Sequence, residues 1–141
     1  MSYYASTDQL IRRLSRLFER MGAVAPEATR AVSTSRLIIR LNLHEPEAEI
    51  LINGRSNPAQ ITYGPASLRP DLDINLPADG LHKILLKELS LKQALASGQM
   101  RVRGPIFKTF ALEKIFRTGQ ALYPGILREI DPSDGLSGAP K

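Results

Sequence analysis

The residues best suited to chemistry are two histidines and one pair of carboxylates. His44 lies in a turn beside Glu45, and His82 lies near the start of an apolar helical segment. Asp71 and Asp73 are two apart in an alternating segment, so both point to its polar face. No HExxH, CxxC, GxSxG or phosphate-loop motif accompanies them. We interpret the histidines as surface or boundary residues and the aspartates as a solvated pair, and we predict no catalytic residue, no metal site and no cofactor.

Positive charge is concentrated near the start of the chain, whose formal net charge is +5. A basic amphipathic helix is predicted over residues 7–22, capped by Ser6 or Thr7 and ended by Gly22. Its polar side carries four arginines: Arg12, Arg13, Arg16 and Arg20. One interpretation is a docked helix with a solvated face. The other is peripheral contact with an anionic membrane or an acidic protein.

A second basic group comprises Arg101, Arg103 and Lys108. Single-stranded nucleic acid is usually bound by basic grooves that also offer aromatic rings for stacking. No aromatic residue alternates with these basic positions, so nucleic acid is not an expected partner.

The remaining pattern predicts the elements that must position these groups. Alternating residues predict strands over 36–43, 48–53, 59–63, 71–76 and 99–103. Apolar residues at helical spacing predict one or two helices over 79–97 and another over 106–118. Residues 1–6 are predicted to be a loose terminus, and 23–35 a connection with at most one helical turn. Short links between the first three strands favour an antiparallel meander.

Length and composition favour one domain. With 141 residues we expect a single domain over 1–130 and a disordered tail over 131–141, where polar, small and proline residues dominate. The chain has no cysteine and no apolar run of about 20 residues, the length that spans a membrane. We expect a cytoplasmic protein.

The order of features from Asp71 to Phe116 resembles the sterol carrier protein 2 (SCP2) family of lipid-binding domains. Asp71 opens an alternating strand, Pro77-Ala78-Asp79-Gly80 leads into an apolar helix, and Ala94 to Gly98 closes a second helix. Gln99 to Gly104 then forms the returning strand, followed by the apolar helix from Ile106 to Phe116. The family commonly ends its first helix with Gly, whereas Lys87-Glu88-Leu89-Ser90-Leu91 stands here.

This resemblance implies an α+β fold: a five-stranded, mostly antiparallel sheet covered on one face by helices, with an apolar tunnel between them. It implies non-catalytic binding and carriage of a sterol, fatty acid, acyl-CoA or other lipid. Either Arg101 or Arg103 could meet an anionic headgroup at the mouth, or face solvent. The residues expected to line the tunnel are apolar: Leu72, Ile74, Leu81, Ile84, Leu85, Leu95, Met100, Val102, Phe107, Phe110 and Ile115.

Two alternatives stay open. One is an accessory protein that presents a hydrophobic intermediate to enzymes of quinone, steroid or polyketide biosynthesis. The other is a catalytic variant of the fold that would use His82 or Asp73. Periodicity alone does not separate a tunnel from a densely packed core.

Overall fold

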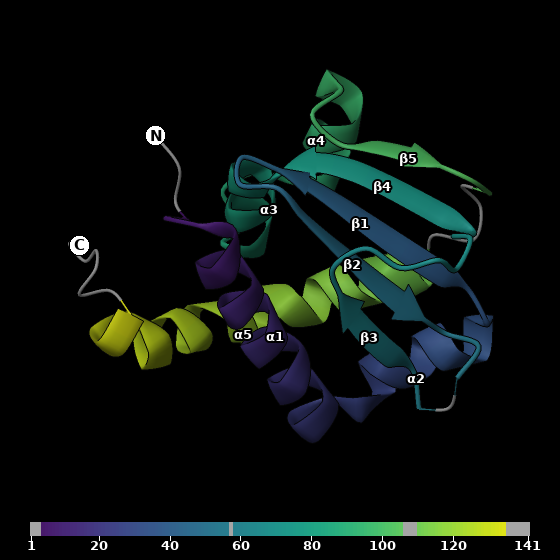
Figure 1. The fold of residues 1–141 in the computed structure, drawn as a ribbon, viewed down its shortest axis with the longest axis horizontal. Helices are drawn as coiled ribbons and strands as arrows, with labels where there is room; N and C mark the ends of the chain where they lie inside the picture. The colour runs from purple at the N-terminus through teal and green to yellow at the C-terminus, as the bar shows by residue number, and fades with distance from the viewer. Residues whose placement is uncertain (1–3, 57, 106–109, 135–141) are drawn as a thin grey trace.

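Five strands form a single sheet in the part of the chain that the computed structural model describes, namely residues 4–56, 58–105 and 110–134 (Figure 1). The strands are β1 (Ile38–His44), β2 (Ala48–Asn53), β3 (Gln60–Tyr63), β4 (Leu72–Pro77) and β5 (Arg101–Arg103), in the order β3-β2-β1-β4-β5. Three neighbouring pairs are antiparallel, and β1 pairs with β4 in parallel. The predicted mostly antiparallel sheet and its opening meander are confirmed.

Helices cover one face of this sheet. They are α1 (Thr7–Val24), α2 (Pro26–Ser35), α3 (Ala78–Leu85), α4 (Leu91–Ser97) and α5 (Phe110–Asp134). Figure 1 shows α1, α2 and α5 gathered together, while α4 stands apart beside the edge strand β5. The fold is α+β, as the sequence predicts.

Alternation along the strands decides which side chains meet the helices. In β1, Ile39, Leu41 and Leu43 are all at most 5% exposed, and across the strand pairs Leu41 lies beside Ile50 and Ile74. These residues join the helices in one apolar core. The intervening positions, such as Arg40 and Asp73, share the opposite face, which we call the outer face.

Local signals fix several helix ends. The Ser6 side chain caps α1 by accepting a hydrogen bond from the Gln9 backbone N–H at 3.1 Å, as predicted. Ser90 and Gln93 form a capping box at the start of α4. Gly98 ends α4 in the left-handed conformation, with φ of 84°.

The structure corrects four boundaries. The first helix continues past Gly22 to Val24, and the predicted connection over 23–35 is largely the helix α2, with a proline at its first position. Helix α5 does not stop at residue 118 but runs on through Pro124. It also enters the predicted tail by four residues, and residues 135–141 lie outside the described chain.

The fourth correction concerns the expected loose terminus. Tyr4 is only 2% exposed, so the segment ahead of α1 is packed into the protein. None of the described helices has the length and apolar character needed to span a bilayer.

Candidate functional site

An apolar cavity of about 30 Å³ lies between the sheet and the helices. The sheet contributes Leu41 and Ile52 to its wall, and α3 contributes Leu81 and Leu85. The remaining lining comes from the two long helices: Leu14, Leu17, Phe18 and Met21 of α1, and Ile115, Phe116 and Gly119 of α5. Every side chain in this wall is apolar, and an apolar cavity of this kind excludes water.

Gly119 brings α5 close to the other two helices at this cavity. A Cβ atom at this position would lie 3.0 Å from Leu85 Cδ2, 3.7 Å from Leu17 Cδ2 and 3.9 Å from Met21 Cε. The missing side chain therefore leaves space at the point where α1, α3 and α5 converge.

The predicted lining residues fall into groups. Leu81, Leu85 and Ile115 do line the cavity. Four more are buried in the surrounding core without reaching it: Leu72, Ile74, Ile84 and Met100. Val102 is half-buried on β5, and Leu95 is 48% exposed on α4, so Leu95 lies outside the wall. Phe107 lies outside the described residues, and Phe110 begins α5 with its side chain undescribed.

Sequence reasoning missed the contribution of α1. The helix over 7–22 is predicted from its amphipathic pattern, but Leu14, Leu17 and Met21 are not among the residues expected to line the tunnel. Leu41 and Ile52, which fall on two of the predicted strands, are likewise absent from the expected lining. The missing signal was proximity in space, because α1 and α5 lie about a hundred residues apart in sequence and pack together in the fold.

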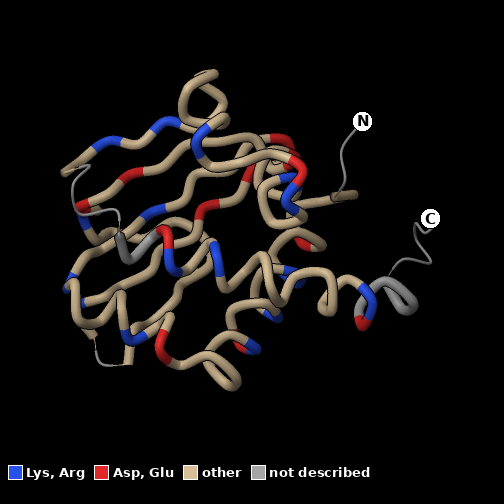
Figure 2. The backbone as a smooth tube through the Cα atoms, turned by 180° about the vertical axis from the view of Figure 1, so that it is seen from behind, with Lys and Arg blue, Asp and Glu red and all other residues tan. Residues whose placement is uncertain are grey.

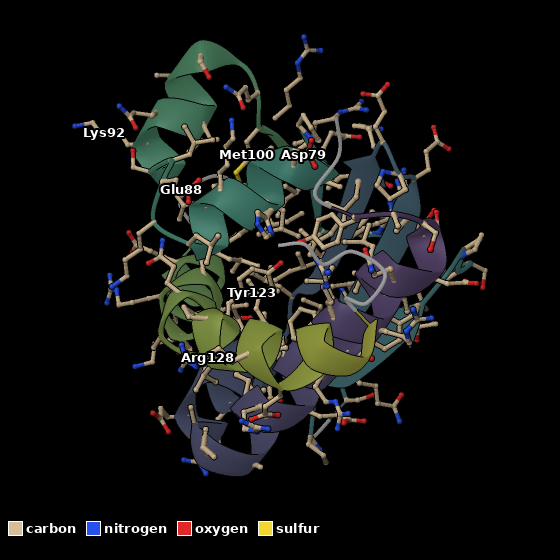
Figure 3. All side chains as sticks on the ribbon, turned by 90° about the vertical axis from the view of Figure 1, so that its left-hand side faces the viewer. Asp79, Glu88, Lys92, Met100, Tyr123 and Arg128 are labelled. Atoms are coloured by element: carbon tan, nitrogen blue, oxygen red, sulfur yellow. The ribbon has the colours of Figure 1, made fainter. Side chains whose placement is uncertain are left out.

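A buried polar cluster of Tyr4, His82 and Tyr123 lies next to this cavity. His82 directly follows Leu81 on α3, and Tyr123 lies one turn after Gly119 on α5. The hydroxyls of Tyr4 and Tyr123 are 2.7 Å apart, and Nδ1 of His82 is 2.8 Å from the Tyr123 hydroxyl. The His82 ring meets both tyrosine rings edge-on. Figure 3 shows Tyr123 in the interior between α5 and α3, whereas Lys92 on α4 points outward. His82 is 7% exposed, so it is an interior residue, whereas we predicted a surface or boundary residue.

Burial governs the chemistry of this cluster. Burial raises the pKa of Tyr4 well above its ordinary value, and the nearby Tyr123 raises it further. Tyr4 is therefore a neutral phenol at physiological pH. Through these two hydrogen bonds the cluster joins the segment before α1 to α3 and α5.

The four arginines of α1 occupy different environments. Arg13 is 7% exposed, and its guanidinium lies 5.3 Å from the centre of the Tyr4 ring. Arg20 bonds to Glu129 of α5 at 2.5 Å. Arg12 and Arg16 are exposed. Contact of this helix with a membrane or an acidic protein stays a prediction, and Arg13 and Arg20 are largely engaged within the fold.

The remaining chemical candidates are not part of the cavity wall. His44 is exposed at the end of β1. Asp73 sits on the outer face, where Arg40 donates to it from Nε at 3.1 Å and from Nη2 at 2.7 Å. That ion pair lowers the pKa of Asp73 and raises the pKa of Arg40. Among the described residues, no three histidine, aspartate or glutamate side chains gather closely enough to hold a metal ion.

Comparison with protein families gives one match that covers most of the chain. The model of the SCP-2 sterol transfer family matches residues 14–117. No curated protein matches the sequence.

Solved structures of similar fold include sterol carrier proteins. The sterol carrier protein domain 2 of Helicoverpa armigera is 16% identical, with a TM-score of 0.66 over 86% of this chain and 95% of that one. Palmitated SCP2L2 from Aedes aegypti is 19% identical, with a TM-score of 0.55 over 75% and 90%. The ubiquinone synthesis protein UbiJ-SCP2 is 17% identical, with a TM-score of 0.50 over 78% and 83%. At these identities the likeness concerns the fold.

Proposed function

The chain belongs to the SCP-2 sterol transfer family, and on that premise we propose that it binds and carries an apolar ligand, a fatty acid, sterol or related lipid, without catalysis. The observation that supports this is the wholly apolar cavity enclosed by α1, α3, α5 and the sheet. A hydrocarbon chain placed there gains about 0.8 kcal/mol for each buried CH₂ group. Sixteen carbons would therefore supply roughly ten kcal/mol before the costs of ordering the ligand.

Binding at this cavity requires the helices to move apart. Pockets that bury small-molecule ligands enclose roughly 300–1,000 Å³, and the cavity between the described residues measures about 30 Å³. Met21, Phe18 and Leu85 occupy the space that a ligand would take. Unbranched methionine adapts readily to a new neighbour, so we propose that the wall at α1 and α5 opens first.

The proposed ligand wall differs from the one expected from sequence. It consists of Leu81, Leu85 and Ile115 from the predicted set, together with the cavity-facing residues of α1 and the strand residues Leu41 and Ile52. Ile74 and Met100 form the layer behind it.

Native mass spectrometry of freshly purified protein, followed by organic extraction, tests this function. We expect a bound lipid, or stoichiometric uptake of a fluorescent fatty acid that unlabelled palmitate displaces. Protein that carries nothing and takes up neither fatty acid nor sterol would contradict the proposal and identify the interior as a filled core.

The accessory role is a second candidate. UbiJ-SCP2, which shares this fold, is described as a ubiquinone synthesis protein. In that role the chain would present its ligand to enzymes, and co-purification with biosynthetic enzymes tests it. Isolation without any enzyme partner, from cells in which the lipid-loaded protein is abundant, would favour simple carriage.

A further inference from the structure

A second concavity, of about 570 Å³, lies at the edge strand β5 on the outer face of the sheet. Its polar lining comes from three strands and the turn before β5: His44, Asn75, Gln99, Arg101 and Arg103. Leu76, Pro77 and Gly98 complete its lining. We call this concavity the outer groove.

Strand register separates the outer groove from the apolar cavity. Arg101 pairs with Asn75 and Arg103 pairs with Asp73, so both arginines share the outer face. Val102 between them pairs with Ile74, which is fully buried on the helix side. The arginines therefore do not point toward the cavity, and a ligand held in the outer groove lies across the sheet from one held between the helices.

The outer groove has an excess of positive charge. Asp73, the carboxylate opposite Arg103 in the strand register, feels the charge of that arginine, but it accepts its hydrogen bonds from Nε and Nη2 of Arg40 and from the Asn42 amide. In the described chain, neither Arg101 nor Arg103 makes an ion pair or a side-chain hydrogen bond. In Figure 2, basic positions lie along the edge strand β5, and an acidic position lies beside them on β4.

The other polar side chains of the outer groove are also available. Those of Asn75, Gln99 and His44 have no hydrogen-bond partner among the described residues. Two guanidinium groups, two amides and an imidazole thus face one concave site with their hydrogen-bonding capacity unused. In a merely solvated strand we would expect such groups to be spread over a flat surface.

The chemistry of these groups identifies the ligand class. Arg101 and Arg103 lie two positions apart, about 6.6 Å along an extended strand. Guanidinium forks match the oxygen pairs of phosphate, and adjacent forks suit a ligand with several phosphate oxygens. We propose that the outer groove binds a phosphate-bearing group, with Arg101 and Arg103 as the principal ligands and Asn75 and Gln99 as amide donors.

Isothermal titration calorimetry of the full chain with pyrophosphate and with a nucleoside diphosphate tests the proposal. We expect saturable binding that weakens with added salt, and at least about tenfold weaker binding by Arg101→Gln/Arg103→Gln, because each charge-assisted hydrogen bond contributes strongly. The control, Arg30→Gln/Lys83→Gln, removes the same charge from exposed positions outside the outer groove. It should bind like the unaltered protein.

Vesicles with and without phosphatidic acid identify the source of the phosphate. Flotation that needs phosphatidic acid and is lost in Arg101→Gln/Arg103→Gln would assign the site to a lipid phosphate. Binding of pyrophosphate alone would assign it to a soluble ligand. Absence of both, or an equal loss in the two double variants, would overturn the proposal.

Fatty-acid uptake is measured on the same variants. Since the outer groove and the apolar cavity lie on opposite faces, uptake should be unchanged in Arg101→Gln/Arg103→Gln. Failure of phosphate binding with normal uptake would therefore refute the outer groove and leave the lipid function standing. Unchanged thermal unfolding confirms that the variants are folded.

Discussion

The hydroxyl of Tyr4 lies 2.7 Å from the hydroxyl of Tyr123, and this contact joins residues 119 positions apart. The residue ahead of α1 is thereby held against the middle of α5, and His82 of α3 bonds to the same Tyr123 hydroxyl. One side chain thus connects three elements around the cavity.

Replacement of Tyr123 by Phe should weaken this connection. The variant keeps the ring and loses two buried hydrogen bonds, so the free energy of unfolding should fall by about 1–3 kcal/mol in urea denaturation. Tyr63→Phe is the matched control, because Tyr63 is half-buried on β3 without a side-chain hydrogen bond in the described chain. Equal effects of the two changes would show that the cluster adds nothing beyond packing.

Gly119→Ala should reduce ligand uptake more than it affects folding. The new methyl group enters the point where α1, α3 and α5 converge, 3.0 Å from Leu85. We expect several-fold weaker fatty-acid binding by fluorescence titration. The stability change should stay within about 1 kcal/mol, since alanine favours the helix and offsets the tight contact.

Gly125→Ala on the same helix separates these two effects. A methyl group there would meet only the Arg128 side chain, at 3.7 Å. It should raise helix stability and leave uptake unchanged. Equal uptake by both glycine variants would place the ligand elsewhere.

Acid should remove the stabilisation provided by Asp73. Hydrogen bonds from Arg40 hold the pKa of Asp73 below its ordinary 3.8. A lowered pKa stabilises the fold above the unfolded-state pKa, and this contribution disappears as pH falls through the folded value. Asp73→Asn should therefore be about 1 kcal/mol less stable at pH 7, and this difference should shrink below about pH 4.

Glu129→Gln provides the comparison for that measurement. Arg20 also lowers the pKa of Glu129, but this pair is more exposed, with 34% and 46% of the two side chains accessible. Its effect should vanish in high salt, whereas that of Asp73 should largely persist. A pH-independent difference between Asp73→Asn and the unaltered protein would contradict the assigned role.

Gly54→Ala should be strongly destabilising. A Cβ atom there would lie 2.4 Å from the Leu37 carbonyl oxygen and 2.5 Å from that of Val32. Both are backbone atoms and cannot rotate away, so we expect a loss of about 2–3 kcal/mol by thermal or chemical denaturation. Gly22→Ala, which meets nothing within 4 Å in α1, should be neutral or stabilising.

The sheet was predictable because alternation is a local property. The alternation of Leu72, Ile74 and Leu76 with polar residues indicates which face of that strand is buried. The turns between the first strands are short. Helix α2 was missed because its alanines, serines and threonines form no broad apolar stripe. Helix α5 was cut short because Pro124 breaks isolated helices. In the fold, the complete burial of Tyr123 and Ile126 on either side of Pro124 stabilises the continuous helix.

The cavity was only partly predictable. Leu81, Leu85 and Ile115 carry the apolar periodicity of their own helices. The arrangement of α1 over α3 and α5 depends on contacts between distant segments, and no local pattern encodes it. The burial of His82 and Tyr4 was also not predictable from a local pattern, because each becomes an interior residue only when the first and last segments of the chain pack together.

The origin of the cavity wall has a consequence for synthesis on the ribosome. The wall needs Leu14 and Met21 from the start of the chain and Ile115 and Gly119 from its last helix. Residues 38–103 can complete the sheet before α5 has emerged, while the apolar sides of α1 and the sheet still lack their cover. The cavity is therefore completed late and all at once, and nascent chains that stop short of α5 should be recognised by chaperones as unfinished.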